Sequence, residues 1–473
     1  MIRITLLTIL IAYLSAYAWK DWFRAACWLV LLMAIFQHPD MPKSVAGIPG
    51  LNHWNFLFIN TLLAWLSGRK KQKLEWEMPS NINFLLWCYG LIIILSVIRY
   101  LSDNSGVIEL FETLGEGPPG KLNDINEYLF NCFKWVIPGM IIFDGCRNRK
   151  QFNFAIIVLA LLYILLALQV IKAMKLGSLT MGGDALQKKA LKIISNSVGF
   201  HRVNVSMMLS GAFWSVFFLK ELATKKQLFF IILPSCFAIF VGMAMTGGRT
   251  GYGTWAVLGL IFCLFKWKKY FLLAPILYAC VTTFAPSSIE RLTQGFSSEE
   301  SSEIEADQTS FEGENVDLQE VTSGRIIAWP LVWEKITEAP FFGYGRVAMQ
   351  NEGLTLKIRQ EHNGEKFPHP HNAYLEWLLD NGFVSAIPVW LFYLLMLKYA
   401  WVLFRDDSNK IYVVTGGVAL SLLSAFLIAS SGSQTFYPRE GALGMWVAIG
   451  LLMRVNIERG KVRKGIDSYL IDK

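Results

Sequence analysis

One short segment of the chain combines residue types that could carry out acid–base catalysis. Pro368–Glu376 reads Pro-His-Pro-His-Asn-Ala-Tyr-Leu-Glu, so His369 and His371 alternate and Asn372 stands where it can cap a following helix. An imidazole titrates near neutral pH, which makes histidine the usual general base. His371 is therefore a candidate base. Two histidines could also ligate a metal, but no third ligand at a suitable spacing stands out, and we predict no metal site.

Three arginines stand where they could bind an anion. Arg249 lies in the turn Thr246–Gly251, whose glycines allow close approach of the backbone and which opens the next apolar segment. Arg202 stands at the start of another apolar segment, and Arg325 follows a serine and a glycine. A guanidinium group matches phosphate oxygens in shape and charge, so these arginines could together hold a diphosphate. Each could instead interact with lipid phosphates at a membrane surface.

Membrane helices must position these residues. Of the 473 residues, 54% are hydrophobic and only 17% are charged, and the mean hydropathy is +0.40. Soluble domains carry about 25% charged residues, so an ordinary soluble enzyme is excluded. Apolar runs of about 17–25 residues recur along the chain, which is typical of transmembrane helices. The sequence therefore predicts an all-α polytopic membrane protein with about 12–13 transmembrane helices.

The basic residues predict the orientation of these helices. Lysines and arginines cluster at 69–73, 147–150, 225–226, 266–269 and 459–464, always after an odd-numbered apolar segment. By the positive-inside rule this side is cytoplasmic, which accounts for the net charge of +8 without a nucleic-acid partner. The histidine and arginine candidates then lie on the outer face, together with a large loop at 287–372. Within that loop, the acidic stretch 299–320 is expected to be solvated and mobile.

Other polar features suggest less. The seven cysteines lie in or beside apolar segments without a Cys-x-x-Cys pair, which favours neither a zinc site nor a disulfide framework. Lys134 is the clearest cation inside an apolar stretch. It could be an interior functional charge or could reach toward a membrane interface.

Together these motifs resemble the bacterial O-antigen ligase and O-antigen polymerase superfamily. The resemblance rests on Arg249 in its small-residue turn, Ser323-Gly324-Arg325 followed by Trp329, Pro340-Phe-Phe-Gly-Tyr-Gly345, and His371–Glu376 followed by Asn381-Gly382. It covers about 195–400, the expected catalytic domain, which includes loop 287–372. Transmembrane helices are expected to fill 1–194, and further helices with a basic cytoplasmic tail to fill 401–473.

The resemblance implies a fold and a reaction. The fold would be a GT-C-like glycosyltransferase architecture in the bacterial inner membrane, with its active face periplasmic. The donor would be a glycan on undecaprenyl diphosphate, and inverting transfer to an acceptor hydroxyl would need neither metal nor cofactor. His371 would be the base and Arg249 would bind the donor. Arg202, Arg325, His369 and Asn372 are further expected substrate contacts.

Several functions remain open. The first hypothesis is a ligase that moves a glycan onto lipid A–core or a similar acceptor. The second is a polymerase that joins lipid-linked repeat units, and a third variant glycosylates protein hydroxyls. A polysaccharide or lipid transporter is the alternative from another class, although the chain lacks the internal repeats common in transporters. The acidic stretch and the segment His38–Pro42 have no counterpart known to us in typical ligases, which leaves the subfamily open.

Overall fold

The protein is helical throughout the part of the chain that the structure describes. This computed structural model describes residues 2–42, 44, 50–284, 286, 289, 325–361, 367–432, 434–468 and 470–471, and contains no strand there. The predicted acidic stretch 299–320, like Ser323 and Gly324, lies outside these residues. Seven helices are long and apolar enough to cross a membrane, and three shorter apolar helices accompany them. The predicted all-helical membrane fold is confirmed, whereas the total of 12–13 spans stays a prediction.

The helices follow one another along the chain with short connections. The first half contains α1 (Ile2–Ala18), α2 (Trp22–Phe36), α3 (His53–Lys71), α4 (Ser80–Ser102), α5 (Ser105–Thr113), α6 (Lys121–Ile125), α7 (Asn131–Gly145), α8 (Arg149–Met174), α9 (Gly183–Ser197) and α10 (Arg202–Phe218). The second half contains α11 (Lys225–Gln227), α12 (Leu233–Ala244), α13 (Arg249–Phe265), α14 (Ala274–Phe284), α17 (Arg325–Glu338), α18 (Ala348–Asn351), α19 (Leu354–Glu361), α20 (Ala373–Phe404), α21 (Lys410–Ser430) and α22 (Leu443–Arg463).

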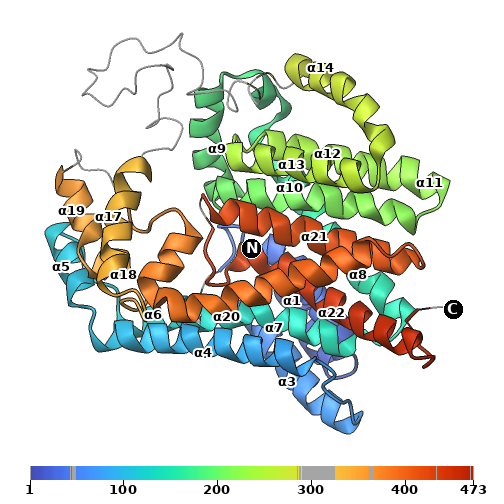
Figure 1. Cartoon of the computed structure of the whole chain (residues 1–473), viewed down its shortest axis with the longest axis horizontal. Helices are drawn as coiled ribbons and strands as arrows, with labels where there is room; N and C mark the ends of the chain where they lie inside the picture. The colour runs from blue at the N-terminus through green and yellow to red at the C-terminus, as the bar shows by residue number, and fades with distance from the viewer. Residues whose placement is uncertain are drawn as a thin grey trace.

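Figure 1 shows two contrasting ends of the helix bundle. The short helices α5, α17, α18 and α19 gather at one end, on the left, while the C-terminal ends of α3 and α22 lie toward the other. In the interior, α21 packs against α10, α20 and α22. Because α21 is apolar all round, it can be buried on every side. By contrast, α4 leaves Phe84 and Trp87 exposed, as expected for a helix that faces lipid.

A break in α20 is closed by a segment from the short-helix end. Gly382 has φ 72° and ψ 177°, so the helical hydrogen bonding is interrupted there. The segment Pro340–Gly345 lies in the gap. Its Tyr344 and Gly345 N–H groups donate to the carbonyls of Leu379 (3.0 Å) and Asp380 (2.7 Å).

The same segment also accepts hydrogen bonds from the far side of the break. Phe383 N donates to Pro340 O at 2.7 Å, and Val384 N donates to Phe341 O at 3.2 Å. A Cβ atom on Gly382 would lie 2.3 Å from the Phe341 backbone, so only glycine permits this approach. The segment thereby satisfies backbone groups that a membrane would leave unpaired.

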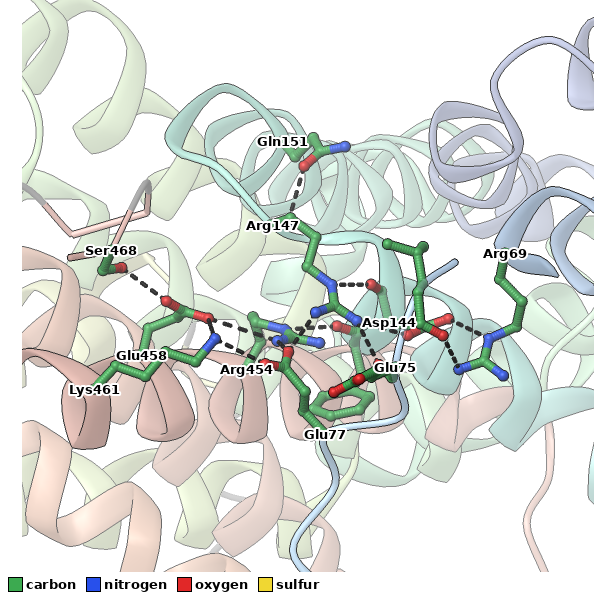
Figure 2. Close-up of polar contacts among 12 residues, drawn as sticks. Arg69, Glu75, Glu77, Asp144, Arg147, Gln151, Arg454, Glu458, Lys461 and Ser468 are labelled. Carbon is green, nitrogen blue, oxygen red and sulfur yellow. Dashed lines mark hydrogen bonds and ion pairs between the residues drawn. The ribbon is translucent and has the colours of Figure 1, made fainter. Parts of the chain in front are cut away.

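At the opposite end, buried ion pairs join three connections of the chain (Figure 2). Glu77, between α3 and α4, pairs with Arg147, Arg454 and Lys461. Nearby, Asp144 at the end of α7 accepts from Arg69 Nε and Arg147 NH2, both at 2.9 Å. Thus three of the predicted basic clusters meet at one end of the bundle. Their assignment to the cytoplasm stays a prediction.

The cations around Glu77 control its titration. Burial alone would raise the pKa of this carboxyl, but the hydrogen bonds from Lys461 and Arg454 outweigh burial and lower the pKa from 4.5 to about 2. The resulting stabilisation is therefore fully present above pH 4.5 and is lost as the pH falls toward 2.

Replacing Glu77 should measurably weaken the fold. Glu77→Gln leaves the fully buried Arg454 without its close carboxylate and should lower the free energy of unfolding by about 2 kcal/mol. This figure is below that for a fully buried pair because the Glu77 side chain is 24% exposed. Thermal unfolding of the purified protein at pH 7 measures the loss. The control is Glu75→Gln, since Glu75 binds Arg147 only through its carbonyl, and equal losses in the two variants would contradict the assignment.

Candidate active site

The turn that carries the two histidines is held from three sides. Trp329 Nε1 on α17 donates to Pro370 O at 2.9 Å. Gln350 Nε2 on α18 donates to Pro368 O at 3.0 Å, and Thr355 Oγ1 on α19 donates to Phe367 O at 2.7 Å. The short helices at this end therefore fix the turn before α20 begins.

Within the turn, His371 adopts a backbone conformation that is unusual for its type. Its φ is 51°, in the left-handed region, where residues other than glycine are strained. His371 N donates to His369 Nδ1 at 3.3 Å, and the centroids of the two rings are 4.2 Å apart. Asn372 Oδ1 accepts from the backbone N–H groups of Tyr374 and Leu375, which confirms its predicted role as a helix cap.

The second candidate element is the turn that precedes Arg249. Arg202 is the first residue of α10 and Arg249 is the first residue of α13. Arg202 NH1 donates to Gly247 O at 3.0 Å, two residues before Arg249. Ser206 Oγ, one turn further along α10, donates to Gly248 O at 3.2 Å. These contacts place the starts of α10 and α13 side by side.

His201 connects the arginine turn to the histidine turn. It immediately precedes Arg202 and lies close enough to His369 to interact with it electrostatically. Burial lowers the pKa of His201, and the charges of Arg202 and His369 lower it further. His201 is therefore held in its neutral form. The structure thus brings Arg202, the Arg249 turn, and both predicted histidines to one end of the bundle.

Arg325 has a position comparable to the other two arginines. It is the first residue of α17, the helix that supplies Trp329 to the histidine turn. Arg202, Arg249 and Arg325 thus each begin a helix. The N-terminus of a helix carries partial positive charge and unpaired N–H groups, so an anion is favoured at each of these positions.

A buried ionic cluster behind the histidine turn escaped the sequence analysis. Arg346 NH1 lies 2.9 Å from Glu376 Oε1 and 3.1 Å from Asp380 Oδ2. Tyr437 OH donates to Asp380 Oδ2 at 2.9 Å, and its ring lies 3.7 Å from the Arg346 guanidinium carbon. Two carboxylates one turn apart on an apolar helix were the available signal, because buried acidic residues require a partner. Nothing in the sequence identified that partner as Arg346.

The close contact between α10 and α13 gives a prediction about stability. A Cβ atom on Gly248 would lie 2.4 Å from Ser206 Oγ and 2.6 Å from Ser206 Cβ. Gly248→Ala should therefore lower the free energy of unfolding by about 1–3 kcal/mol, as overpacking does. Thermal unfolding measures this change. In a Ser206→Gly background, most of the cost should vanish.

Gly253→Ala is the matched control, since nothing lies within 4 Å of that Cβ position on the same helix. The control should unfold like the wild type or at a slightly higher temperature. The proposed contact would be refuted if Gly248→Ala cost as much in the Ser206→Gly background as in the wild type.

Comparison with known proteins supports the resemblance drawn from the motifs. Residues 234–389 match the Wzy_C family model, which is described as O-antigen ligase. The match includes Arg249, Arg325 and the His369–Asn372 turn, while Arg202 lies before it. No curated protein matches the chain in sequence. The family transfers lipid-linked glycans in the manner of O-antigen ligases and polymerases. The chain is thus a multi-pass membrane protein that carries an O-antigen ligase domain of the Wzy_C family at residues 234–389.

Proposed function

We propose that the protein transfers a glycan from undecaprenyl diphosphate to an acceptor hydroxyl at the outer face of the inner membrane. The acceptor is lipid A–core or a similar glycolipid, as for an O-antigen ligase. His371 acts as general base, and Arg249, Arg202 and Arg325 bind the diphosphate of the donor. The reaction uses no metal and no cofactor.

One observation carries this proposal: the contacts that run from the arginine turn to the histidine turn. Arg202 binds the backbone just before Arg249, and its neighbour His201 interacts with His369. His369 in turn accepts from the backbone N–H of His371. An anion-binding end of two helices therefore adjoins a pair of imidazoles, which is what transfer from a diphosphate requires.

The chemistry follows from these residue types. His371 takes the proton of the acceptor hydroxyl as the oxygen forms its bond to the anomeric carbon of the donor sugar. The bond from that carbon to the diphosphate breaks, and its electron pair leaves with undecaprenyl diphosphate. The arginines and the helix N-termini stabilise the charge on the leaving group. Because attack and departure occur on opposite sides of the carbon in one step, the anomeric configuration inverts.

The second candidate within the same chemistry is a polymerase. It would use a second lipid-linked repeat unit as acceptor, so the base and the diphosphate site would keep their roles. Protein O-glycosylation differs again only in the acceptor. A polysaccharide transporter would need neither a base nor an ordered histidine turn, so the three hydrogen bonds that hold this turn favour transfer.

Substitutions should separate catalysis from donor binding. His371→Ala should abolish transfer and leave donor affinity nearly intact, because the base acts on the acceptor. Arg249→Ala should weaken donor binding by about tenfold or more, since it removes a charge-assisted contact. Both effects are measured with purified protein, an undecaprenyl diphosphate-linked glycan and acceptor.

The neighbouring histidine supplies the internal control. His369→Ala should reduce transfer less than His371→Ala does. If His371→Ala transferred glycan at the wild-type rate while His369→Ala did not, the base would be His369. Wild-type rates in both variants would refute the histidine mechanism and favour a transporter.

Acceptor choice distinguishes the ligase from the polymerase. Donor supplied with lipid A–core should yield glycan on lipid A–core, seen as a shift of that acceptor on a gel. Donor supplied alone should leave the lipid-linked glycan at its original length. Lengthening of the lipid-linked chain without lipid A–core would establish the polymerase instead.

A further inference from the structure

A second cavity lies at the same end of the bundle as the histidine turn. Its volume is about 320 Å³, within the range of small-ligand sites. Its walls come from the end of α2, the starts of α3 and α7, and the connection between α21 and α22. The residues that define its chemistry are Asn52, Asn55, Asn126, Asn131, Lys134 and Arg346, beside the rings of Trp54, Trp135, Tyr128 and Tyr437.

This cavity is separate from the candidate active site. Neither His369, His371, Arg202 nor Arg249 is among its lining residues. Arg346 forms the boundary, because it lines the cavity and pairs with Glu376, which itself interacts electrostatically with His369. The connection between α21 and α22 also touches both regions. Its Gln434 binds Asn204 on α10, and its Arg439 lines the cavity.

The lining offers the contacts that a saccharide needs. Each asparagine presents a carbonyl acceptor and an amide donor, which suits hydroxyl groups that both donate and accept. The indole rings of Trp54 and Trp135 lie 4.7 Å apart and provide apolar surface for the C–H faces of a sugar. Lys134 Nζ lies 4.7 Å from the Trp135 ring centroid, at the edge of this surface.

Buried polar atoms in the wall also point to a ligand. Within the described part of the chain, Asn55 Oδ1 and Arg346 Nε are buried without a hydrogen-bond partner. Arg346 is only 5% exposed. A buried polar atom left unpaired costs about 1–3 kcal/mol, so such atoms normally have a partner. Hydroxyl groups of a bound sugar could fill this role.

The charges of the cavity fit a saccharide better than a free anion. Arg346 is already compensated by two carboxylates. Two further cations, Lys134 and Arg439, face the carboxylates of Glu127 and Glu440 in the same lining. An isolated phosphate would meet charges of both signs, whereas a polyhydroxylated ring can bind to all of them.

We propose that this cavity binds a short saccharide segment of a glycan substrate, outside the site of transfer. The inference rests on the proposed function, which supplies the glycan. The segment comes either from the donor repeat unit or from the acceptor oligosaccharide, since both present the same hydroxyl chemistry. Binding there would hold the glycan beside the histidine turn while its reacting end enters the active site.

Direct binding to the full-length protein in lipid nanodiscs tests the proposal. The probes are the donor oligosaccharide freed from its lipid by mild acid, the delipidated core oligosaccharide of the acceptor, and inorganic phosphate. Isothermal titration calorimetry gives each dissociation constant. We expect one of the two saccharides to bind, and the one that binds identifies the source.

Two cavity variants have a matched control. Asn131→Ala and Lys134→Met should each weaken saccharide binding by about tenfold, because each removes hydrogen-bonding capacity from the wall. Asn123→Ala should bind like the wild type, since Asn123 is exposed on the neighbouring α6 and does not line the cavity. Thermal unfolding identifies any variant that fails to fold, in which case the other variant carries the test.

Several outcomes would overturn the proposal. These are absence of saccharide binding to the wild type, unchanged binding in both folded variants, or phosphate binding that Lys134→Met weakens while saccharide binding stays the same. The last result would mark an anion site. His371→Ala should keep full saccharide affinity, so loss of the base mechanism and loss of this cavity's role are measured separately.

Discussion

The closure of the break in α20 is the constraint on which the candidate site depends. A helix interrupted inside a membrane leaves carbonyl and N–H groups that lipid cannot satisfy, at a cost of several kcal/mol each. Pro340–Gly345 satisfies these groups on both sides of Gly382. The segment is held from behind as well, since Arg99 on α4 donates to the carbonyls of Phe342 (2.5 Å) and Gly343 (2.6 Å). The short outer helices are thus fixed to two long helices through backbone contacts.

This closure also determines where the buried charges lie. Arg346 directly follows the inserted segment, and its N–H donates to Ser96 O on α4 at 3.0 Å. Its side chain therefore reaches the first two turns of α20, where Glu376 and Asp380 need a cation. Removing one member of such a cluster would leave a buried charge uncompensated. The histidine turn begins the same helix, so α20 aligns the candidate base and the ionic cluster along one rigid element.

Some of this arrangement could be predicted from the sequence, and the reason lies in how local each signal is. Apolar runs predicted the helices, and the position of Asn372 before such a run predicted its cap, because both depend on neighbouring residues. The glycine-rich Pro340–Gly345 segment was recognised as a motif, yet its role depends on contacts with Gly382, about 40 positions away. The pairing of Arg346 with α20 and the cavity beside it depend on several distant segments meeting, which a single sequence does not encode legibly.

The charges around the histidines run in one direction, and this fits the proposed reaction. Arg202 and the helix N-terminus at Arg249 make one side of the group positive, while Glu376 lies near His369 on the other side. In the proposed mechanism, the diphosphate belongs on the arginine side. The proton taken up by His371 creates a positive ring 4.2 Å from His369, so a nearby carboxylate lowers the free energy of that state. Leaving-group charge and proton are then separated in opposite directions, each toward the protein charge that stabilises it.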